Sequence, residues 1–333
     1  MLTLTFIRNH REKLFSLGFF FGSQFLFSGS AFSIETYPIK PITFVVSSSP
    51  GGGTDGMARL IAESMSQDLR QPIIVENIPG AGGAIAAKIV AKSKPDGYKV
   101  LFTTGGFVIA PLVLPNSGYD PVKQFFGVRQ IATVPLIVVV KRASIFNSLS
   151  DLIAFARKDD SITYASFGIG TPSHIAGEAI KQYSGIELTH IPYAGSSKAL
   201  PDIQSDRVTF GILDASFAAP MIQQGVLKGL AITGQQRLNL LPDVPTLKEV
   251  GIPFDLVGWY GVFVPAETGS EVIVKLRDAF DRSIAKSSVK QRILSSGLGY
   301  VDDSMSPIQW NKKYLEDMQQ WDELIKKLNI LKE

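Results

Sequence analysis

The amino-acid sequence predicts an α/β protein built of two lobes. Short apolar runs rich in β-branched residues alternate with longer segments whose apolar residues recur every three or four positions. The chain has 333 residues, a length that favours two lobes with a core each. Because no flexible linker separates two halves, we expect the chain to cross between the lobes more than once.

The predicted strands and helices follow one another as repeated strand–helix units. The strands are short, apolar and rich in β-branched residues, and they are 42–46, 73–75, 98–103, 136–140, 162–165, 208–213 and 227–233. The helices have apolar residues along one face, and they are 54–71, 84–91, 151–157, 172–183, 218–224 and 307–331. Such units predict parallel sheets covered by helices.

The last predicted helix, 307–331, carries Trp310, Tyr314 and Trp321 on one apolar stripe. A stripe of this kind could bind a partner protein. We expect it instead to dock on the lobe to which the helix belongs, as terminal helices commonly do.

The first 33 residues are typical of a secretory signal peptide. Basic residues between positions 8 and 13 precede an apolar run over 14–27, and small residues follow it. A membrane anchor is the alternative, but this run has 14 residues where a spanning helix needs roughly 20. We expect export and cleavage near Ala31 or Ser33. The chain has no cysteine, so a lipid anchor on cysteine and a disulfide are both excluded.

The charge of the mature chain is close to neutral. Removal of the signal peptide takes away three basic residues and one acidic residue, which lowers the formal net charge from +3 to +1. No basic stripe remains, which argues against nucleic acid as a partner. An anionic ligand would therefore need a local binding device rather than bulk charge.

The segment from Ser47 to Asp55 is a glycine-rich turn between the first predicted strand and helix. Glycines at 51–53 allow a ligand to approach the backbone and permit positive φ, and Thr54 is expected to cap the helix. Free N–H groups and the helix dipole form an anion site there without Lys or Arg. The alternative is an ordinary strand–helix turn. A Walker loop is excluded, since no Gly-Lys-Ser/Thr follows.

A second turn of this kind runs from Ser166 to His174. Thr171 is expected to cap the following helix, with Pro172 at its first position. Two such loops on separate lobes could hold one small anionic molecule between them. A third glycine-rich segment, 77–83, could serve either packing or ligand contact, and it lacks the dinucleotide-binding spacing.

The sequence argues against an enzyme, a metal site and a cofactor. It contains no G-x-S-x-G elbow, no cysteine and no H-E-x-x-H motif. His174 could act as a base for Ser166 or Ser173, but no third orienting residue is evident. We expect structural hydrogen bonds at His174 and a partly buried, satisfied imidazole at His190.

A series of different short motifs is spread over nearly the whole mature chain. They are Tyr37-Pro-Ile-Lys-Pro-Ile42, Pro50-Gly-Gly-Gly-Thr-Asp55, Val75-Glu-Asn77, Pro79-Gly-Ala-Gly-Gly83, Pro95-Asp-Gly-Tyr98, Gly168-Ile-Gly-Thr-Pro-Ser-His174, Ile191-Pro-Tyr-Ala-Gly195 and Leu241-Pro-Asp-Val-Pro-Thr246. Together they resemble the Bug-type receptors, the TctC-like substrate-binding proteins of tripartite tricarboxylate transporters.

This resemblance implies a periplasmic binding protein of type II, a Venus flytrap whose cleft lies between two α/β lobes. Residues 34–135 and 256–333 would form lobe 1, residues 136–255 lobe 2, and strands 136–140 and 259–264 the hinge. The implied function is capture of a small carboxylate by a monomeric receptor that serves integral-membrane permease subunits. A co-receptor that senses the ligand for a membrane histidine kinase is the alternative.

The resemblance also implies the binding residues, which hold a ligand carboxylate through backbone amides, hydroxyls and ordered water. The candidates are Ser48, Ser49, Pro50, Gly51, Gly52, Thr54, Asp55, Ser166, Gly168, Gly170, Thr171, Ser173 and His174, with Asp214 added by its position after strand 208–213.

Two features leave the ligand open. Asp55 would repel a carboxylate, unless it caps backbone N–H groups, orients water or meets a ligand amino group. Ser47 to Ser49 stand where Bug-type receptors often have apolar residues, aromatic residues or proline. Their hydroxyls could bind the ligand, which could be a di- or tricarboxylate, an aromatic acid or an amino acid.

Overall fold

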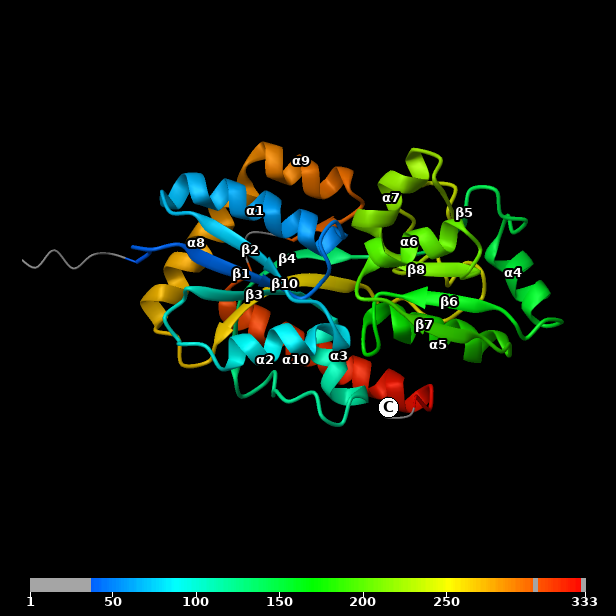
Figure 1. Cartoon of the computed structure of the whole chain (residues 1–333), viewed down its shortest axis with the longest axis horizontal. Coiled ribbons are helices and arrows are strands. Elements are labelled where there is room, and N and C mark those ends of the chain that lie inside the picture. Colours follow the sequence, from blue (N-terminus) through cyan, green and yellow to red (C-terminus); the bar gives the residue numbers. More distant parts are fainter. Residues whose placement is uncertain (1–36, 302–304, 331–333) are drawn as a thin grey trace, which may run out of the picture. The chain divides into compact units, whose positions relative to one another are not determined.

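The computed structural model describes residues 37–301 and 305–330. The predicted signal peptide, its cleavage site near Ala31 or Ser33, and the end of the last predicted helix lie outside the described residues. The described chain forms two β-sheets with flanking helices (Figure 1), which confirms the predicted α/β fold with two lobes.

The first sheet has six strands in the order β11-β4-β10-β3-β1-β2. Its strands are β1 (Ile42–Val46), β2 (Ile73–Asn77), β3 (Lys99–Thr104), β4 (Phe125–Val134), β10 (Gly258–Pro265) and β11 (Gly299–Tyr300). β1 pairs in parallel with β2 and β3. β10 is antiparallel to β3 and β4, and β11 is antiparallel to β4.

Helices cover both faces of this sheet. They are α1 (Gly53–Leu69), α2 (Ala84–Ala91), α3 (Gly106–Val113), α8 (Ser270–Ala285), α9 (Ser287–Ser295) and α10 (Pro307–Lys327), with a short 3₁₀ turn at Ala81–Gly83. Phe44 of β1 packs with α1, α8 and α9, whereas the next residue, Val45, packs in the core formed with α2, α3 and α10. Figure 1 shows the same two helix groups on opposite sides of the sheet.

The second sheet has five strands in the order β7-β6-β8-β5-β9. They are β5 (Leu136–Lys141), β6 (Thr163–Ser166), β7 (Thr189–Pro192), β8 (Phe210–Asp214) and β9 (Leu227–Ile232). The helices in this part of the chain are α4 (Leu149–Ala156), α5 (Pro172–Ser184), α6 (Ser196–Gln204) and α7 (Ala215–Gln223). β6 is parallel to β7 and β8, whereas β5 is antiparallel to β8 and β9.

The prediction of parallel sheets is therefore right for the central strand–helix units and wrong for the remaining strands. The chain leaves the first sheet at the end of β4, passes Pro135 and enters the second sheet as β5. It returns between β9 and β10. β5 and β10 each follow a crossing between the two sheets and not a helical crossover within one sheet. They are therefore free to pair antiparallel with their neighbours. The expectation that the chain crosses more than once is confirmed.

Several elements were not predicted, namely α3, β4, α6, α8, α9 and β11. The 10 residues of β4 are buried almost throughout and lack an alternating pattern, since helices cover both faces of the sheet at this strand.

The docking of α10 differs from the expectation in part. Its first half packs on the first sheet, whereas its end reaches α5 through a hydrogen bond from Gln182 to the carbonyl of Lys327. Among residues 37–301 and 305–330, no helix is both long and apolar enough to cross a membrane.

Candidate functional site

A cavity of about 30 Å³ lies where the two lobes meet. Both lobes contribute to its wall, which is formed by Ser47, Ser48, Gly52, Gly53, Thr54, Gly82, Thr104, Gly105, Val134, Leu136, Phe167, Thr171, Pro172, Gly195, Ser196, Asp214, Gly258, Trp259 and Tyr260.

The start of α1 forms one side of this cavity. Gly52 is the extended residue that precedes the helix, and the first helical hydrogen bond runs from the Gly56 N–H to the Gly52 carbonyl at 3.0 Å. No described side chain caps the N–H groups at the start of α1. Gly52, Gly53 and Thr54 line the cavity, so these N–H groups and the positive end of the helix dipole face an acceptor placed there.

The predicted cap at Thr54 is wrong. The helix begins at Gly53, so Thr54 is already its second residue and has helical backbone geometry, whereas a cap residue is extended. Positive φ occurs in this loop at Gly51 and not at Gly52. The glycines therefore matter mainly by exposing the backbone to the cavity.

Asp55 lies behind the loop and does not line the cavity. Its carboxylate accepts hydrogen bonds from the Gly51 N–H at 2.9 Å and from the Asn77 amide at 2.9 Å, and it pairs with Arg59 at 3.0 Å. Burial alone would raise the pKa of Asp55, but the bonds from Arg59, Gly51 and Asn77 hold it below its usual value. Of the three roles considered for Asp55, the structure shows the binding of a backbone N–H group.

The three serines before Pro50 have three different environments. The hydroxyl of Ser47 bonds that of Thr103 at 2.8 Å. The hydroxyl of Ser49 donates to the Ala194 carbonyl at 2.8 Å, on the turn that leads into α6. The Ser48 hydroxyl is buried at the cavity wall and has no partner among the described residues, so it is available to a ligand.

The second glycine-rich loop mainly satisfies its own hydrogen bonds. Thr171 caps α5 by accepting from the His174 N–H, and Pro172 is the first residue of the helix, as predicted. The Thr171 hydroxyl also donates to the Gly168 carbonyl at 2.5 Å. Ser173 accepts from the Phe167 N–H at 3.0 Å. The loop therefore presents mainly Phe167, Thr171 and Pro172 to the cavity.

The two described histidines lie beneath this loop. Their rings stack with centroids 4.4 Å apart, and His174 accepts from the Gly170 N–H at 3.4 Å. Ser166 bonds His190 at 2.7 Å, so the imidazole beside this serine is not that of His174. Burial and, as a smaller cause, the neighbouring His174 lower the pKa of His190 to about 3. Ser166 is fully buried and does not line the cavity, which argues against a nucleophile there.

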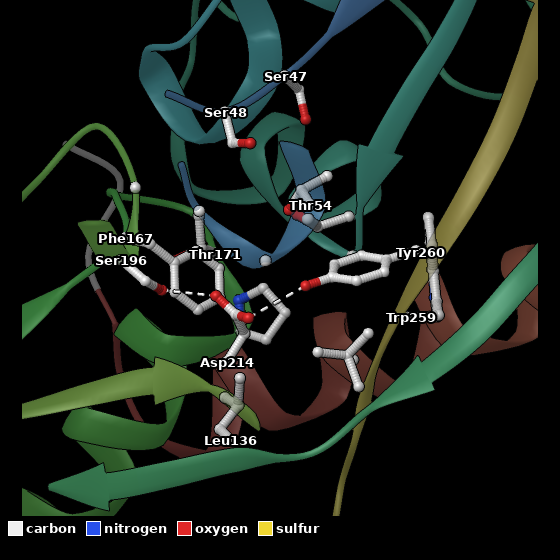
Figure 2. Close-up of a pocket in the computed structure, with 18 of the residues that line it drawn as sticks. Ser47, Ser48, Thr54, Leu136, Phe167, Thr171, Ser196, Asp214, Trp259 and Tyr260 are labelled. Atoms are coloured by element: carbon white, nitrogen blue, oxygen red, sulfur yellow. Dashed lines mark hydrogen bonds between the residues drawn. The ribbon is translucent and has the colours of Figure 1, made fainter. Parts of the chain in front are cut away.

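Asp214 ends β8 and caps α7 by accepting from the Phe217 N–H at 3.0 Å. It also accepts from the hydroxyls of Ser196 and Ser216 at 2.6 Å each, and from that of Tyr260 at 3.1 Å. Figure 2 shows Asp214 between Ser196 and Tyr260 at the cavity wall. Burial and the nearby Asp214 charge raise the pKa of Tyr260 well above its usual value. The carboxylate thereby connects both lobes.

The comparisons with known proteins assign the chain to a family. Residues 57–330 match the profile of the tripartite tricarboxylate transporter family receptor. The chain belongs to this receptor family. The resemblance inferred from the sequence motifs is thus confirmed, and the receptors of this family are solute-binding proteins rather than enzymes.

Relatives of this receptor are similar over most of their length. Protein BugT of Bordetella pertussis is 31% identical over 296 residues, which are 87% of this chain and 89% of BugT. The solved structure of the periplasmic binding protein BugD is 32% identical with a TM-score of 0.86, over 89% of this chain and 100% of that chain.

Two similar solved structures contain dicarboxylates. Rpa4515 of R. palustris, solved with adipate, is 30% identical with a TM-score of 0.85, over 89% of this chain and 99% of that chain. MatC of Rhodopseudomonas palustris, solved with bound malate, is 28% identical with a TM-score of 0.83, over 87% of this chain and 100% of that chain.

In this family receptor, the cavity contains part of the predicted set. The predicted residues that line it are Ser48, Gly52, Thr54, Thr171 and Asp214. The predicted residues that lie outside its wall are Ser49, Pro50, Gly51, Asp55, Ser166, Gly168, Gly170, Ser173 and His174. Those outside lie in the same loops but bond within the loop, to the neighbouring strand β7 or across to the other lobe.

Sequence reasoning missed the other side of the cavity. Trp259 and Tyr260 line it and carried no motif of their own, whereas Phe167 lies within the predicted loop 166–174 but was not among the candidate residues. Gly195 and Ser196 also line it, at the start of α6, where no described side chain caps the helix. The sequence did contain a signal for Gly195 and Ser196. Their turn has a strand, a glycine, small polar residues and a helix in the same order as the two predicted glycine-rich turns.

Proposed function

We propose that this protein is an exported receptor that binds the carboxylate of a small solute at the start of α1 and delivers it to the permease subunits of a tripartite tricarboxylate-type transporter. The observation that carries the proposal is the start of α1, where no described side chain caps the helix that faces the cavity. N–H groups in that position bind an anion without a basic side chain.

The buried Ser48 hydroxyl supports the same proposal, because it adds a donor at the cavity wall that no described protein atom uses. The adipate and malate found in Rpa4515 and MatC are carboxylates, which supports this ligand class for a relative of the same fold. We further propose that the protein acts in the periplasm as a monomer, without a cofactor and without catalysis.

Closure of two lobes on the ligand completes the proposal, with residues 136–255 moving as one lobe. Ser49 bonds Ala194, and the Ser197 hydroxyl donates to the Pro50 carbonyl at 3.0 Å, so the α1 loop contacts the α6 turn directly. Closure is favoured by a ligand only if contacts made in the closed state exceed those in the open state. The cavity wall, formed by both lobes, supplies such contacts.

Calorimetric titration with carboxylic acids and with the matching primary amides tests this function. We expect at least one acid to bind and its neutral amide to bind at least about tenfold more weakly, because the helix start attracts negative charge. Binding of no small acid, or equal binding of acid and amide, would contradict the proposal.

A variant locates the site. Gly52→Val should abolish binding, because the glycine is expected to let the ligand approach the backbone. It should leave thermal unfolding nearly unchanged, because φ at Gly52 is −81° and the nearest described atom to an added Cβ is 3.5 Å away. Gly56→Val in the same helix is the control, since no described atom lies within 4 Å of its Cβ, and it should bind normally. A large loss of stability in Gly52→Val would instead indicate a structural turn.

A further inference from the structure

A second pocket lies beside the crossing by which the chain returns to the first sheet. Its volume is about 290 Å³, which suits a small organic molecule. Its wall comes from β4, from the segment between β9 and β10, from β10 itself and from α10. The residues that line it are Gln130, Thr133, Gln235, Asp255, Leu256, Val257, Gly258, Trp259, Lys313, Asp317 and Gln320.

Gln130 is a buried polar side chain of this pocket. It is 1% exposed, and neither its amide oxygen nor its amide nitrogen has a hydrogen-bond partner among the described residues. An amide that is buried without partners is unfavourable, because it has lost its bonds to water. A molecule in the pocket that bonds this amide would remove the penalty. The amide therefore points to a ligand.

The charged side chains of the pocket leave an excess of negative charge. Among the described residues that line it, Asp255 and Asp317 are acidic and Lys313 is basic. Lys313 pairs with Asp317 at 3.4 Å, whereas Asp255 makes no ion pair with a described residue. Burial raises the pKa of Asp317, and Lys313 offsets this only in part. A further positive charge in the pocket would therefore be attracted.

We infer that this pocket binds a small organic cation, namely a protonated primary amine. An ammonium group supplies the missing positive charge and donates three hydrogen bonds, for which Asp255, Asp317 and the Gln130 carbonyl are acceptors. The carbon part of the amine packs on Leu256 and Trp259, a surface that a metal ion would not use. This site is separate from the start of α1 and does not depend on carboxylate binding there.

The pocket is also connected to the approach of the two lobes. Gly258 and Trp259 line both the pocket and the cavity between the lobes, where Figure 2 shows Trp259, so the start of β10 lies between the two spaces. Gln235 belongs to the second lobe and Gln130 to the first, and the lobes are in contact in this structure. Since opening would move these side chains apart, an amine in the pocket favours the closed arrangement.

Calorimetric titration of the full-length mature protein at neutral pH tests the site. The probes are butylamine and benzylamine, each compared with the alcohol of the same carbon skeleton. We expect at least one amine to bind and its alcohol to bind at least about tenfold more weakly, because only the amine carries the charge that the pocket attracts. Binding of neither amine, equal binding of amine and alcohol, or tighter binding of calcium or magnesium chloride would overturn the inference.

Two variants assign the binding to this pocket. Gln130→Leu should weaken amine binding at least about tenfold, while thermal stability stays the same or rises, because an unbonded buried amide is removed. Asp255→Asn changes an exposed side chain and should weaken binding about fivefold, the effect of one unit charge at about 4 Å in water. Glu316→Gln is the control on α10, since Glu316 pairs with Lys312 outside the pocket, and it should bind normally.

Unchanged amine affinity in Gln130→Leu or in Asp255→Asn would place the amine elsewhere and overturn the assignment. Small-angle X-ray scattering measures the effect on the lobes. Saturating amine should reduce the radius of gyration of the wild type, and an unchanged or larger radius would overturn this effect. These titrations contain no acid, so failure of the proposed carboxylate function would not alter their outcomes.

Discussion

Ser47, Ser48 and Ser49 are chemically identical, yet each has a different role in the structure. Ser47 bonds Thr103 within the first lobe, Ser49 bonds the Ala194 carbonyl across the cleft, and Ser48 faces the cavity. The difference follows from the backbone, which turns from β1 into α1 over these residues and points each side chain in a new direction. Hydroxyl content alone therefore says little about which serine meets a ligand.

His190 makes stability depend on pH. Its pKa is about 3 in the folded protein and about 6.5 in an unfolded chain, so the unfolded state binds the proton more readily. The free energy of unfolding should therefore decrease as the pH is lowered from about 7 to about 5. Urea unfolding of the wild type and of His190→Gln measures this, and the variant should lose less stability over the same range.

Glutamine is a suitable replacement because it retains a group that can bond Ser166 and does not titrate. Between about pH 8 and pH 9 the two proteins should respond alike, since His190 is neutral in both states there. An equal loss of stability in both proteins between about pH 7 and pH 5 would assign the acid sensitivity to other groups.

Two of the helices that begin at the cavity, α1 and α6, differ from α4 and α10 in how they begin. α4 and α10 start with complete capping boxes at Ser148 and Ser306, and their first N–H groups are satisfied. α1 and α6 start after Gly52 and Gly195 without a described side-chain cap. A ligand acceptor can fill the place that a capping oxygen occupies elsewhere, which is why glycine suits these two starts.

α10 is anchored on the first sheet by Trp310, which is fully buried and meets Trp259 edge to face with centroids 5.1 Å apart. Gly127 and Gly261 make room for its ring, because an added Cβ at either would lie 2.8 Å from it. Trp310→Ala should lower the free energy of unfolding by about 3–5 kcal/mol, as measured by urea denaturation.

Ile308 on the same helix provides the control, since it is 78% exposed. Ile308→Ala should change stability by no more than about 0.5 kcal/mol. If α10 were chiefly a partner-binding helix, Trp310→Ala would leave the isolated protein as stable as the wild type, and that result would overturn the docking argument.

At the scale of the whole molecule, the proposed function depends on how closely the lobes approach one another. Gly53, at the start of α1, faces Asp214 and Ser216 of the other lobe and the hydroxyl of Tyr260. A Cβ at position 53 would come closer to Asp214 and Ser216 than non-bonded atoms can pack. The absence of a side chain at Gly53 is thus a condition for the close approach of the lobes in this structure.

Gly53→Ala should hold the lobes apart. We expect ligand affinity to fall at least about tenfold, because contacts from the second lobe are lost from the bound state. Small-angle X-ray scattering with ligand should show a larger radius of gyration than for the wild type.

Gly56→Ala is the matched control, because its Cβ meets no described atom within 4 Å and alanine favours the helix. It should bind and close like the wild type. Normal affinity and normal closure in Gly53→Ala would show that the lobes do not need this approach.

The sequence by itself determined the strand–helix units, the glycine-rich turns and the family. These are local features: β1 and α2 were predicted with their observed bounds because hydrophobic period and turn residues act over a few positions. The cap at Thr171 was also predicted correctly, since threonine followed by proline marks a helix start.

The tertiary structure alone decided which residues meet at the site. Thr104, Val134 and Tyr260 come from three distant segments, and nothing in their local sequence indicates a shared cavity. Even within the glycine-rich loops, Gly52 lines the cavity while Asp55 lies behind it. The antiparallel strands β5 and β10 were decided likewise by the crossings between sheets. Strand pairing and the meeting of two lobes depend on contacts far apart in the chain, which no local pattern records.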